Sequence, residues 1–395
     1  MSAASLRVAP TSNHLIASTA RLLGTATTRQ SARLLTSKRG ICTATSRSFP
    51  ASIMDNVRNT LAENFSGPAS KLGTRQFELD QCPDLTGKVG VITGGSRGIG
   101  FAVAYTFLKH NISKLYIISV SPDVIAASKR EIASDLGEEV ANRIVWKQCD
   151  LTNWAKVHKI AEEISADTDR LDMLVNNAGR GVMTAQQTDY GVDRHMALNH
   201  MGHMVLTSGL LPLLKKTAER GNVVRITHQS SNAHQNAPSD TKFESLAEIN
   251  EDVGPNGQYG RSKLASILYT RWFARTNGEK NLLMNATHPG FVSTTQSVKD
   301  VFEPYPRAGY IMSHVVDPIK KDQWQGAVPT VYAATTTTES GEWVCPPAIP
   351  EPGSEQAQSE ELQEALMALT GKIYREKMHP VIADKGQKYE DLVLV

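Results

Sequence analysis

Short apolar runs alternate with longer segments of helical spacing from Lys88 onward. The apolar runs predict buried strands, and the longer segments, whose apolar residues recur every three or four positions, predict helices. Strands are expected near residues 89–93, 115–120, 143–149, 172–176, 223–228, 282–287 and 342–345. Helices are expected near residues 98–110, 122–136, 153–166, 191–218 and 257–276. Such alternation is typical of an α/β fold, a doubly wound parallel sheet of about seven strands with helices on both faces.

The chain on either side of residues 86–345 does not follow this alternation. Residues 55–85 form a lead-in segment, in which a short helix near 55–64 is followed by a breaker and polar chain, and we place it outside the core. Residues 346–395 begin rich in proline and then show an amphipathic helix near 360–377. We interpret them as a strap and a C-terminal helix, which either docks onto the body or offers a surface to a partner.

Basic residues are concentrated at the N-terminus. Residues 1–54 carry seven basic side chains and no Asp or Glu, which leaves 35 basic and 40 acidic residues for the rest of a chain with net charge +2. An acid-free leader rich in Arg, Ser, Thr and Ala is typical of a mitochondrial transit peptide. A disordered basic tail is the alternative, and Met54 offers an internal start for a cytoplasmic form.

The remainder of the chain excludes two classes of partner. Its mildly acidic balance argues against nucleic acid. No apolar run reaches the roughly 18 residues that span a bilayer, so we expect no spanning membrane segment.

Cysteine and histidine spacing argues against a metal site. The four cysteines are Cys42, Cys82, Cys149 and Cys345. They show no paired spacing, which indicates reduced thiols with neither a zinc site nor a disulfide framework. The histidines that invite a metal interpretation are His195, His200, His203, His228 and His234. No acidic partner stands at ligand spacing beside them, so we expect no metal.

A glycine-rich turn, Thr-Gly-Gly-Ser-Arg-Gly-Ile-Gly over residues 93–100, joins the first predicted strand to the first predicted helix. Backbone N–H groups at a helix N-terminus are unpaired, and the helix dipole favours negative charge there. The missing side chains at Gly94, Gly98 and Gly100 let a pyrophosphate approach the backbone. The turn predicts a dinucleotide bound to a Rossmann-type sheet; a turn needed only for packing is the alternative.

Tyr259 and Lys263 lie four positions apart in a helical pattern and therefore on one helix face. A phenol with a pKa of about 10 is a poor acid or base near neutrality, whereas a nearby ammonium lowers that pKa. The pair is a candidate acid and base for a carbonyl or an alcohol. Tyr-x-x-x-Lys alone is frequent by chance and also fits a solvated helix face.

Five motifs in order over residues 86–345 resemble the classical short-chain dehydrogenase/reductase family. The glycine turn has that family's Thr-Gly-x-x-x-Gly-x-Gly spacing, and residues 176–179 match its Asn-Asn-Ala-Gly element. Residues 149–151 match the position whose acid meets the adenine, and residues 288–294 match the Pro-Gly-x-Val-x-Thr loop at the nicotinamide end. The cofactor-binding residues that the resemblance and the strand ends indicate are Gly94, Ser96, Arg97, Gly98, Ile99, Gly100, Ser121, Asp150, Leu151, Asn177, Ala178, Gly179, Tyr259, Lys263, Pro289, Gly290, Val292 and Thr294.

The resemblance also implies four catalytic residues. Tyr259 would be the general acid and base, and Lys263 would lower its pKa and bind the nicotinamide ribose. Asn199 would hold a proton-relay water, and Ser231 would hydrogen-bond the substrate oxygen. Because Ser230 precedes Ser231 and a strand alternates its faces, only one of the two can point at the substrate, and the family usually uses the second.

The chain departs from compact members of the family between Ser231 and Tyr259, which are 28 residues apart. The inserted stretch 235–257 is interpreted as a flap or wall of the cleft. Its length, together with Asn-His-Met-Gly-His and Ser-Asn-Ala-His, is similar to the retinol-dehydrogenase-like and WW-domain-oxidoreductase-like branch, although no WW domain is evident.

Charge at the end of the second predicted strand favours NADP(H) over NAD(H). An acid normally holds the free ribose hydroxyl of NAD, but none stands at residues 119–121, and Arg97 lies in the turn where a cation would meet a 2′-phosphate. Asp123 weakens this argument slightly, although after Pro122 it should begin the next helix.

The sequence therefore predicts an NADP(H)-dependent oxidoreductase that moves a hydride between the nicotinamide and a small, apolar carbonyl compound or alcohol. A cofactor-binding sensor or scaffold protein with little turnover is the alternative. A nucleotide-sugar epimerase is disfavoured by the three residues between Gly94 and Gly98. The apolar pattern over residues 204–214 suits a homodimer, and equally a buried helix.

Overall fold

The computed structural model describes residues 53–65, 67–292 and 321–384. Within these ranges no helix is long and apolar enough to cross a membrane.

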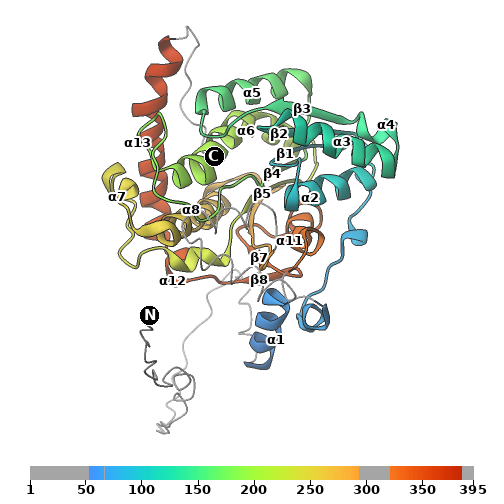
Figure 1. The fold of residues 1–395 in the computed structure, drawn as a ribbon, viewed down its shortest axis with the longest axis horizontal. Helices are drawn as coiled ribbons and strands as arrows, with labels where there is room; N and C mark the ends of the chain where they lie inside the picture. The colour runs from blue at the N-terminus through green and yellow to red at the C-terminus, as the bar shows by residue number, and fades with distance from the viewer. Residues whose placement is uncertain (1–52, 66, 293–320, 385–395) are drawn as a thin grey trace, which may run out of the picture. The chain divides into compact units, whose positions relative to one another are not determined.

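Eight strands form one sheet in the order β3-β2-β1-β4-β5-β6-β7-β8 (Figure 1). The strands are β1 (Val89–Thr93), β2 (Lys114–Ser119), β3 (Ile144–Gln148), β4 (Met173–Asn176), β5 (Val224–Gln229), β6 (Leu282–Thr287), β7 (Trp343–Cys345) and β8 (Ile349–Glu351). Strands β1 to β7 pair in parallel, and the strand order reverses between β1 and β4. This is a Rossmann-type doubly wound sheet, which confirms the predicted fold class. Sheets of this kind bind their ligands at the point where the strand order reverses, which here is the carboxyl ends of β1 and β4.

The eighth strand departs from the prediction of a proline-rich strap. Residues Ile349–Glu351 form β8, which pairs antiparallel with β7 at the edge of the sheet. Proline lacks an N–H group and is therefore tolerated only at sheet edges, which is where Pro350 stands.

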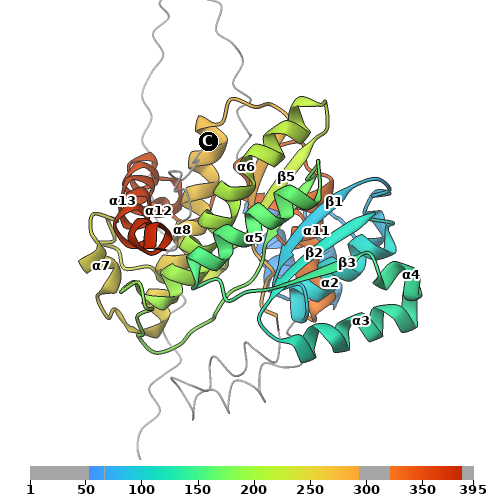
Figure 2. The ribbon, with the colours of Figure 1, turned by 90° about the horizontal axis from the view of Figure 1, so that it is seen from above.

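Helices cover both faces of the sheet (Figure 2). The helices of the body are α2 (Gly98–Lys109), α3 (Pro122–Leu136), α4 (Glu138–Ala141), α5 (Trp154–Asp167), α6 (His203–Glu219), α7 (Leu246–Asn250), α8 (Gly254–Thr276) and α11 (Gln323–Thr335). Neighbouring residues of β1 enter two different cores, because successive side chains of a strand point to opposite faces. Val91 packs with residues of α5, α6 and α8, whereas Ile92 packs with residues of α2, α3 and α11.

The predicted helix over 191–218 is divided into two parts. The first part is a π-helical turn, η3 (Met196–Gly202), and the second is α6. A separate short helix, η4 (Asn232–Asn236), follows β5. The large apolar side chains over 204–214 are buried within the chain, as expected for a core helix.

The ends of the described chain pack against this body. The lead-in segment forms α1 (Ile53–Asn64), η1 (Gly67–Leu72) and η2 (Leu79–Gln81). It differs from the prediction that it lies outside the core, since Phe77 and Leu85 are buried among residues of α2 and α11. After α12 (Glu355–Gln358), helix α13 (Glu360–Asp384) docks onto α8, where Glu364 pairs with Arg275.

Candidate active site

The glycine turn lies at the carboxyl end of β1, and its glycines are required by geometry. Gly94 and Gly98 have φ of +68° and +59°, the left-handed region that favours glycine. A Cβ on Gly100 would lie 2.3 Å from the carbonyl oxygen of Gly94 and 2.4 Å from Nδ2 of Asn177. Asn177 in turn donates to the carbonyl of Thr93 at 2.9 Å. The turn is therefore held tightly against the loop that follows β4.

A buried chain of hydrogen bonds connects the glycine turn to Asn199. Oγ1 of Thr93 accepts from the N–H groups of Asn177 and Ala178, each at 2.9 Å. The same oxygen lies 2.9 Å from Nε2 of His203, whose Nδ1 lies 3.1 Å from the carbonyl oxygen of Asn199. Burial lowers the pKa of His203 to about 4, so the ring is neutral. Because a carbonyl only accepts, Nδ1 carries the proton and Nε2 accepts from the Thr93 hydroxyl.

Asn199 lies inside the π-helical turn η3, a deviation that is frequent at functional sites. Its Oδ1 accepts from the N–H of Arg180 at 3.0 Å, and its Nδ2 donates to the carbonyl of Arg180 and to Oγ of Ser262. A Cβ on Gly179 would lie 3.3 Å from this Oδ1 and 3.4 Å from Nζ of Lys263. The β4 loop, η3 and α8 therefore meet at Gly179.

Tyr259 and Lys263 share one face of α8, as their spacing predicts. Nζ of Lys263 lies 5.6 Å from the centre of the Tyr259 ring and donates to the carbonyl of Gln229 at 2.8 Å. Lys263 is buried, and burial lowers its pKa to about 8. Tyr259 is half-buried, and the ring of His195 lies 6.4 Å from its ring. A cation thus stands beside a phenol at the end of β5.

The structure separates the two adjacent serines. Ser230 is buried, and its hydroxyl donates to the carbonyl of Lys263 at 2.8 Å, so its proton is already used. The hydroxyl of Ser231 is half-buried and accepts from the N–H of Ala233 at 3.1 Å, where η4 begins. A Cβ on Gly260 would lie 2.6 Å from the carbonyl of Ala233, so η4 packs directly on the helix of Tyr259. This geometry favours Ser231 over Ser230 as the substrate-facing serine.

The candidate adenine end lies at the carboxyl ends of β2 and β3. Ser121 caps α3 by accepting from Val124, and Arg97 is exposed at the N-cap of α2. Asp150 is exposed, and its Oδ1 accepts from the N–H and hydroxyl of Thr152.

Three other residues predicted for the cofactor site are buried or half-buried among neighbouring elements. Ser96 and Leu151 are buried, and the carbonyl of Leu151 would lie 2.4 Å from a Cβ on Gly202. Ile99 is half-buried and would lie 3.3 Å from a Cβ on Gly326 of α11.

The candidate nicotinamide end is the loop after β6. Gly290 has φ of +77°, and a Cβ there would lie 2.8 Å from Cδ of Lys321. Val292 forms a bridge with Lys321, and Pro289 connects this loop to β6. Thr294 lies outside the described residues. Lys321 was missed from the sequence because no motif marks it.

The histidines considered as metal ligands have other partners. Nε2 of His200 lies 3.0 Å from the hydroxyl of Thr370, and Nε2 of His228 lies 3.2 Å from the amide of Asn176. Cys82, Cys149 and Cys345 are buried and free, and Cys42 lies outside the described residues. In the part of the chain that the structure describes, no three His, Cys, Asp or Glu side chains form a metal-binding group.

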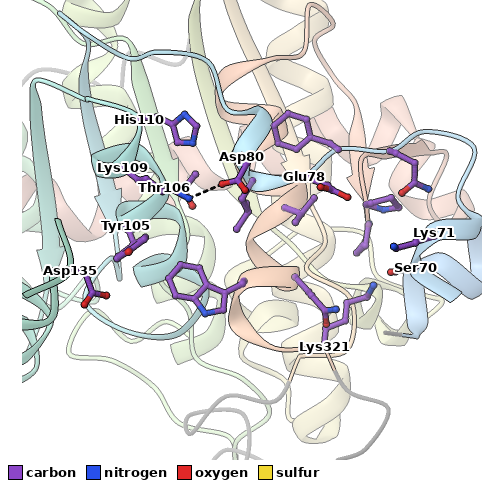
Figure 3. Close-up of a pocket in the computed structure, with 18 residues that line it drawn as sticks. Ser70, Lys71, Glu78, Asp80, Tyr105, Thr106, Lys109, His110, Asp135 and Lys321 are labelled. Carbon is purple, nitrogen blue, oxygen red and sulfur yellow. Dashed lines mark hydrogen bonds and ion pairs between the residues drawn. The ribbon is translucent and has the colours of Figure 1, made fainter. Parts of the chain in front are cut away.

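A cavity of about 490 Å³ lies between the lead-in segment, α2 and α11, and Lys321 is the residue it shares with the loop after β6 (Figure 3). Phe77, Tyr105 and Trp324 line it, and an ion pair between Lys109 and Asp80 spans 2.8 Å along its wall. None of the predicted catalytic residues lines this cavity.

The fold and the arrangement of motifs define a dinucleotide-dependent oxidoreductase. The family profile described as short chain dehydrogenase matches residues 88–242. The Neurospora crassa protein bli-4, whose name gives it provisionally as an oxidoreductase and as mitochondrial, is 59% identical over 86% of this chain and 84% of its own length. The chain belongs to the short-chain dehydrogenase/reductase family and is an oxidoreductase.

Two further relatives indicate the branch of the family. Mouse retinol dehydrogenase 14 is 32% identical over 59% of this chain and 69% of its own length. The human WW domain-containing oxidoreductase is 27% identical over 77% of this chain and 72% of its own length. These similarities confirm the predicted retinol-dehydrogenase-like branch.

Solved structures show the same fold. The crystal structure of an uncharacterized protein from Mycobacterium paratuberculosis superposes with a TM-score of 0.59 at 24% identity, over 76% of this chain and 98% of that one. The Pseudomonas aeruginosa RhlG/NADP active-site complex superposes with a TM-score of 0.50 at 22% identity, over 64% and 91%.

Proposed function

We propose that the protein interconverts a carbonyl compound and an alcohol with NADP(H), and that Tyr259 is the acid and base. The observation that carries this proposal is the buried Lys263, whose Nζ stands 5.6 Å from the centre of the Tyr259 ring. An ammonium in a site of low polarity favours the phenolate and so brings the phenol closer to the pKa that proton transfer near neutrality requires.

The glycine turn fits a dinucleotide. The cradle at the N-terminus of α2 has no side chain at Gly94, Gly98 or Gly100, and Asn177 holds it from behind. These residues would bind the pyrophosphate, and Lys263 with the Gly290 loop would hold the nicotinamide end. A bound nicotinamide supplies or accepts the hydride.

The hydrogen bonds of Ser231 and Asn199 support the roles that we propose for these two residues. Ser231 accepts from Ala233 and so keeps its own proton to donate to the substrate oxygen. Asn199 is fixed by Arg180 and Ser262, which suits a rigid support for a proton relay beside Lys263.

Charge supports NADP(H) over NAD(H). The end of β2 presents Ser119 and Ser121, while Arg97 is exposed at the start of α2. Asp123 is exposed in the first turn of α3, where an acid stabilises the helix end. An apolar substrate is supported by similarity to a protein whose name gives retinol as its substrate.

A mitochondrial location is part of the proposal. The acid-free residues 1–54 supply the composition, and the relative from Neurospora crassa is named mitochondrial. Fractionation of cells that express the full chain, with a fluorescent tag after Val395, would test it.

The test of the function is turnover. A panel of apolar aldehydes, ketones and alcohols is offered with NADPH or NADP⁺, and cofactor absorbance is followed. We expect turnover by the protein and a loss of at least about a hundredfold in Tyr259→Phe, with NADPH binding retained. A panel that stays silent while NADPH binds would favour the sensor or scaffold alternative.

A further inference from the structure

The last turn of α1 contacts two loops of the proposed site. Oε1 of Glu63 accepts a hydrogen bond from Nδ2 of Asn232 and lies 3.5 Å from Nε2 of His288. Asn232 directly follows Ser231, and His288 directly precedes Pro289. The Glu63 side chain is only 13% exposed, so this carboxylate belongs to the interior and not to the surface.

Glu63, Asn232 and His288 form a closed set of contacts. The N–H of Asn232 donates to Nδ1 of His288 at 3.3 Å. Burial lowers the pKa of His288 to about 3, so the ring is neutral. Since Nδ1 accepts, the ring proton is on Nε2, which faces Glu63. Glu63 therefore holds the side chains of Asn232 and His288, and the main chain of Asn232 holds the His288 ring from its other side.

A second contact presses the same end of α1 onto the Gly290 loop. Lys321 is 2% exposed, and its Nζ donates to the carbonyl of Ala62 at 2.8 Å and to that of Phe65 at 3.3 Å. A Cβ on Gly290 would lie 2.8 Å from Cδ and Cε of Lys321 and 2.9 Å from the carbonyl of Glu63. Glycine at this position is what lets α1, Lys321 and the loop approach one another.

A buried carboxylate with several fixed partners restricts geometry more than it adds stability. Burial raises the pKa of Glu63, and the hydrogen bond from Asn232 and the charge of Lys321 oppose that rise. The β8 end of the sheet, where Glu351 hydrogen-bonds Asn59 of α1, keeps the helix in place (Figure 1). The middle and the C-terminal end of α1 are thus tied to the body.

We infer that Glu63 is a positioning residue, and that α1 holds the Ser231 turn and the Gly290 loop at a fixed separation. This inference rests on the proposed function, in which Ser231 meets the substrate oxygen and the Gly290 loop meets the nicotinamide. The separation of the two loops then sets the distance over which the hydride moves. Rates of such transfers fall steeply when the reacting groups are displaced by about 1 Å.

The test compares variants of the full chain in carbonyl reduction with NADPH. We expect Glu63→Ala to lower kcat by about tenfold to a hundredfold, with a smaller change in KM. Glu63→Gln keeps an acceptor for Asn232 and should lose less. Asp55→Ala removes a carboxylate from the first turn of the same helix that is 37% exposed and lies 3.9 Å from Arg58, and it should match the wild type.

A swapped pair separates a positioning role from general destabilisation. Asn232→Asp places two carboxylates together and should lower kcat, whereas Glu63→Gln/Asn232→Asp restores one donor and one acceptor and should recover most of that loss. Recovery of kcat without a matching change in the thermal midpoint supports the inference. A kcat of Glu63→Ala within twofold of the wild type, or no recovery in the double variant, overturns it.

The fluorescence of the binary complex with NADPH distinguishes a failure of this inference from a failure of the proposed function. If the wild type reduces no compound of the panel, the proposed function fails, and the fluorescence of bound NADPH still reports the surroundings of the nicotinamide. A changed emission in Glu63→Ala but not in Asp55→Ala then supports the positioning role. Identical emission in all three proteins overturns it.

Discussion

Lys263 donates from its buried Nζ to the main-chain carbonyl of Gln229 at 2.8 Å, which connects the helix of Tyr259 to the last residue of β5. The hydroxyl of Ser230, the residue directly after β5, donates to the carbonyl of Lys263, so a second bond joins the end of β5 to α8. The buried position of Lys263 disfavours the charged ammonium, and burial therefore lowers its pKa to about 8. The cation beside Tyr259 is therefore one whose protonation changes just above neutrality.

Carbonyl reduction should depend on the protonation of Lys263. We expect kcat/KM to fall as the pH rises through about 8. In reduction Tyr259 gives its proton to the substrate oxygen and becomes a phenolate, which the ammonium of Lys263 stabilises and the neutral amine does not. Lys263→Arg keeps its charge over this range and should lose the decline, at a lower rate because of the bulkier side chain. Steady-state kinetics from pH 6 to about 9.5 would show both profiles; the same decline in the arginine variant would exclude Lys263 as its cause.

The free energy of unfolding should rise with pH where kcat/KM falls. The pKa of Lys263 is lower in the folded protein than in the unfolded chain, so the unfolded chain binds more protons between about pH 8 and 10.5 and stability rises with pH over that window. Lys263→Met removes this group. Urea unfolding at about pH 8 and pH 10 should show that the wild type gains about 2 kcal/mol more than the variant.

The hydroxyl of Thr93 is expected to matter more than its methyl group. It accepts from Asn177 and Ala178 and donates to His203. The N–H of Asn177 also donates to the carbonyl of Val175 at 3.1 Å, so Thr93→Val leaves the N–H of Ala178 and Nε2 of His203 without their partner. We expect the variant to lose about 2–4 kcal/mol of unfolding free energy and to bind NADPH more weakly, because the glycine turn loosens. Thr93→Ser keeps the hydroxyl and should stay within about 1 kcal/mol of the wild type. Equal stability of Thr93→Val in urea titrations would contradict this network.

Periodicity was sufficient to predict the sheet. The central strands β1 and β2 are apolar runs that are buried almost throughout, and burial on both faces favours such runs whatever the details of packing. In β3 and β5, shorter apolar stretches that include polar residues were enough to indicate a strand. The strand β8 could not be predicted in this way, because Pro350 and Glu351 read as a linker and only the edge position in the sheet makes them a strand. Tertiary pairing, not local preference, determines this element.

In the candidate site, too, local patterns predicted some residues, whereas others depend on contacts between distant parts of the chain. Motif residues such as Gly94 and Tyr259 were visible because their spacing within one segment carries the chemistry. Glu63 was not, since its partners Asn232 and His288 lie 169 and 225 positions away and no local pattern connects them. His203 was noticed only as a metal candidate, because its role depends on a hydroxyl in β1.

Gly100 should not tolerate a methyl group, although alanine is the better helix former. A Cβ there would overlap the carbonyl of Gly94 and Nδ2 of Asn177, and both belong to the packed turn. We expect Gly100→Ala to lower the thermal midpoint, through a loss of about 1–3 kcal/mol, and to weaken NADPH binding. Gly278→Ala is the matched control, since nothing lies within 4 Å of its Cβ position. Calorimetry and fluorescence titration of both variants would decide, and equal behaviour would contradict the tight turn.

Cofactor preference should follow the charge at the start of α2 and α3. Arg97 is exposed at the N-cap of α2, beside the glycine turn. A charge-assisted bond from its guanidinium to a 2′-phosphate, worth about 1.5–3 kcal/mol, corresponds to roughly tenfold to a hundredfold in affinity. We expect Arg97→Ala to raise the Kd for NADPH by that factor and to leave the Kd for NADH unchanged. Ser121→Asp should add to the effect by placing an acid where a ribose hydroxyl is held in NAD-dependent folds. Fluorescence titrations with both cofactors measure the ratio directly. Tighter binding of NADH than NADPH by the wild type, or an unchanged NADPH affinity in Arg97→Ala, would reverse the proposed preference.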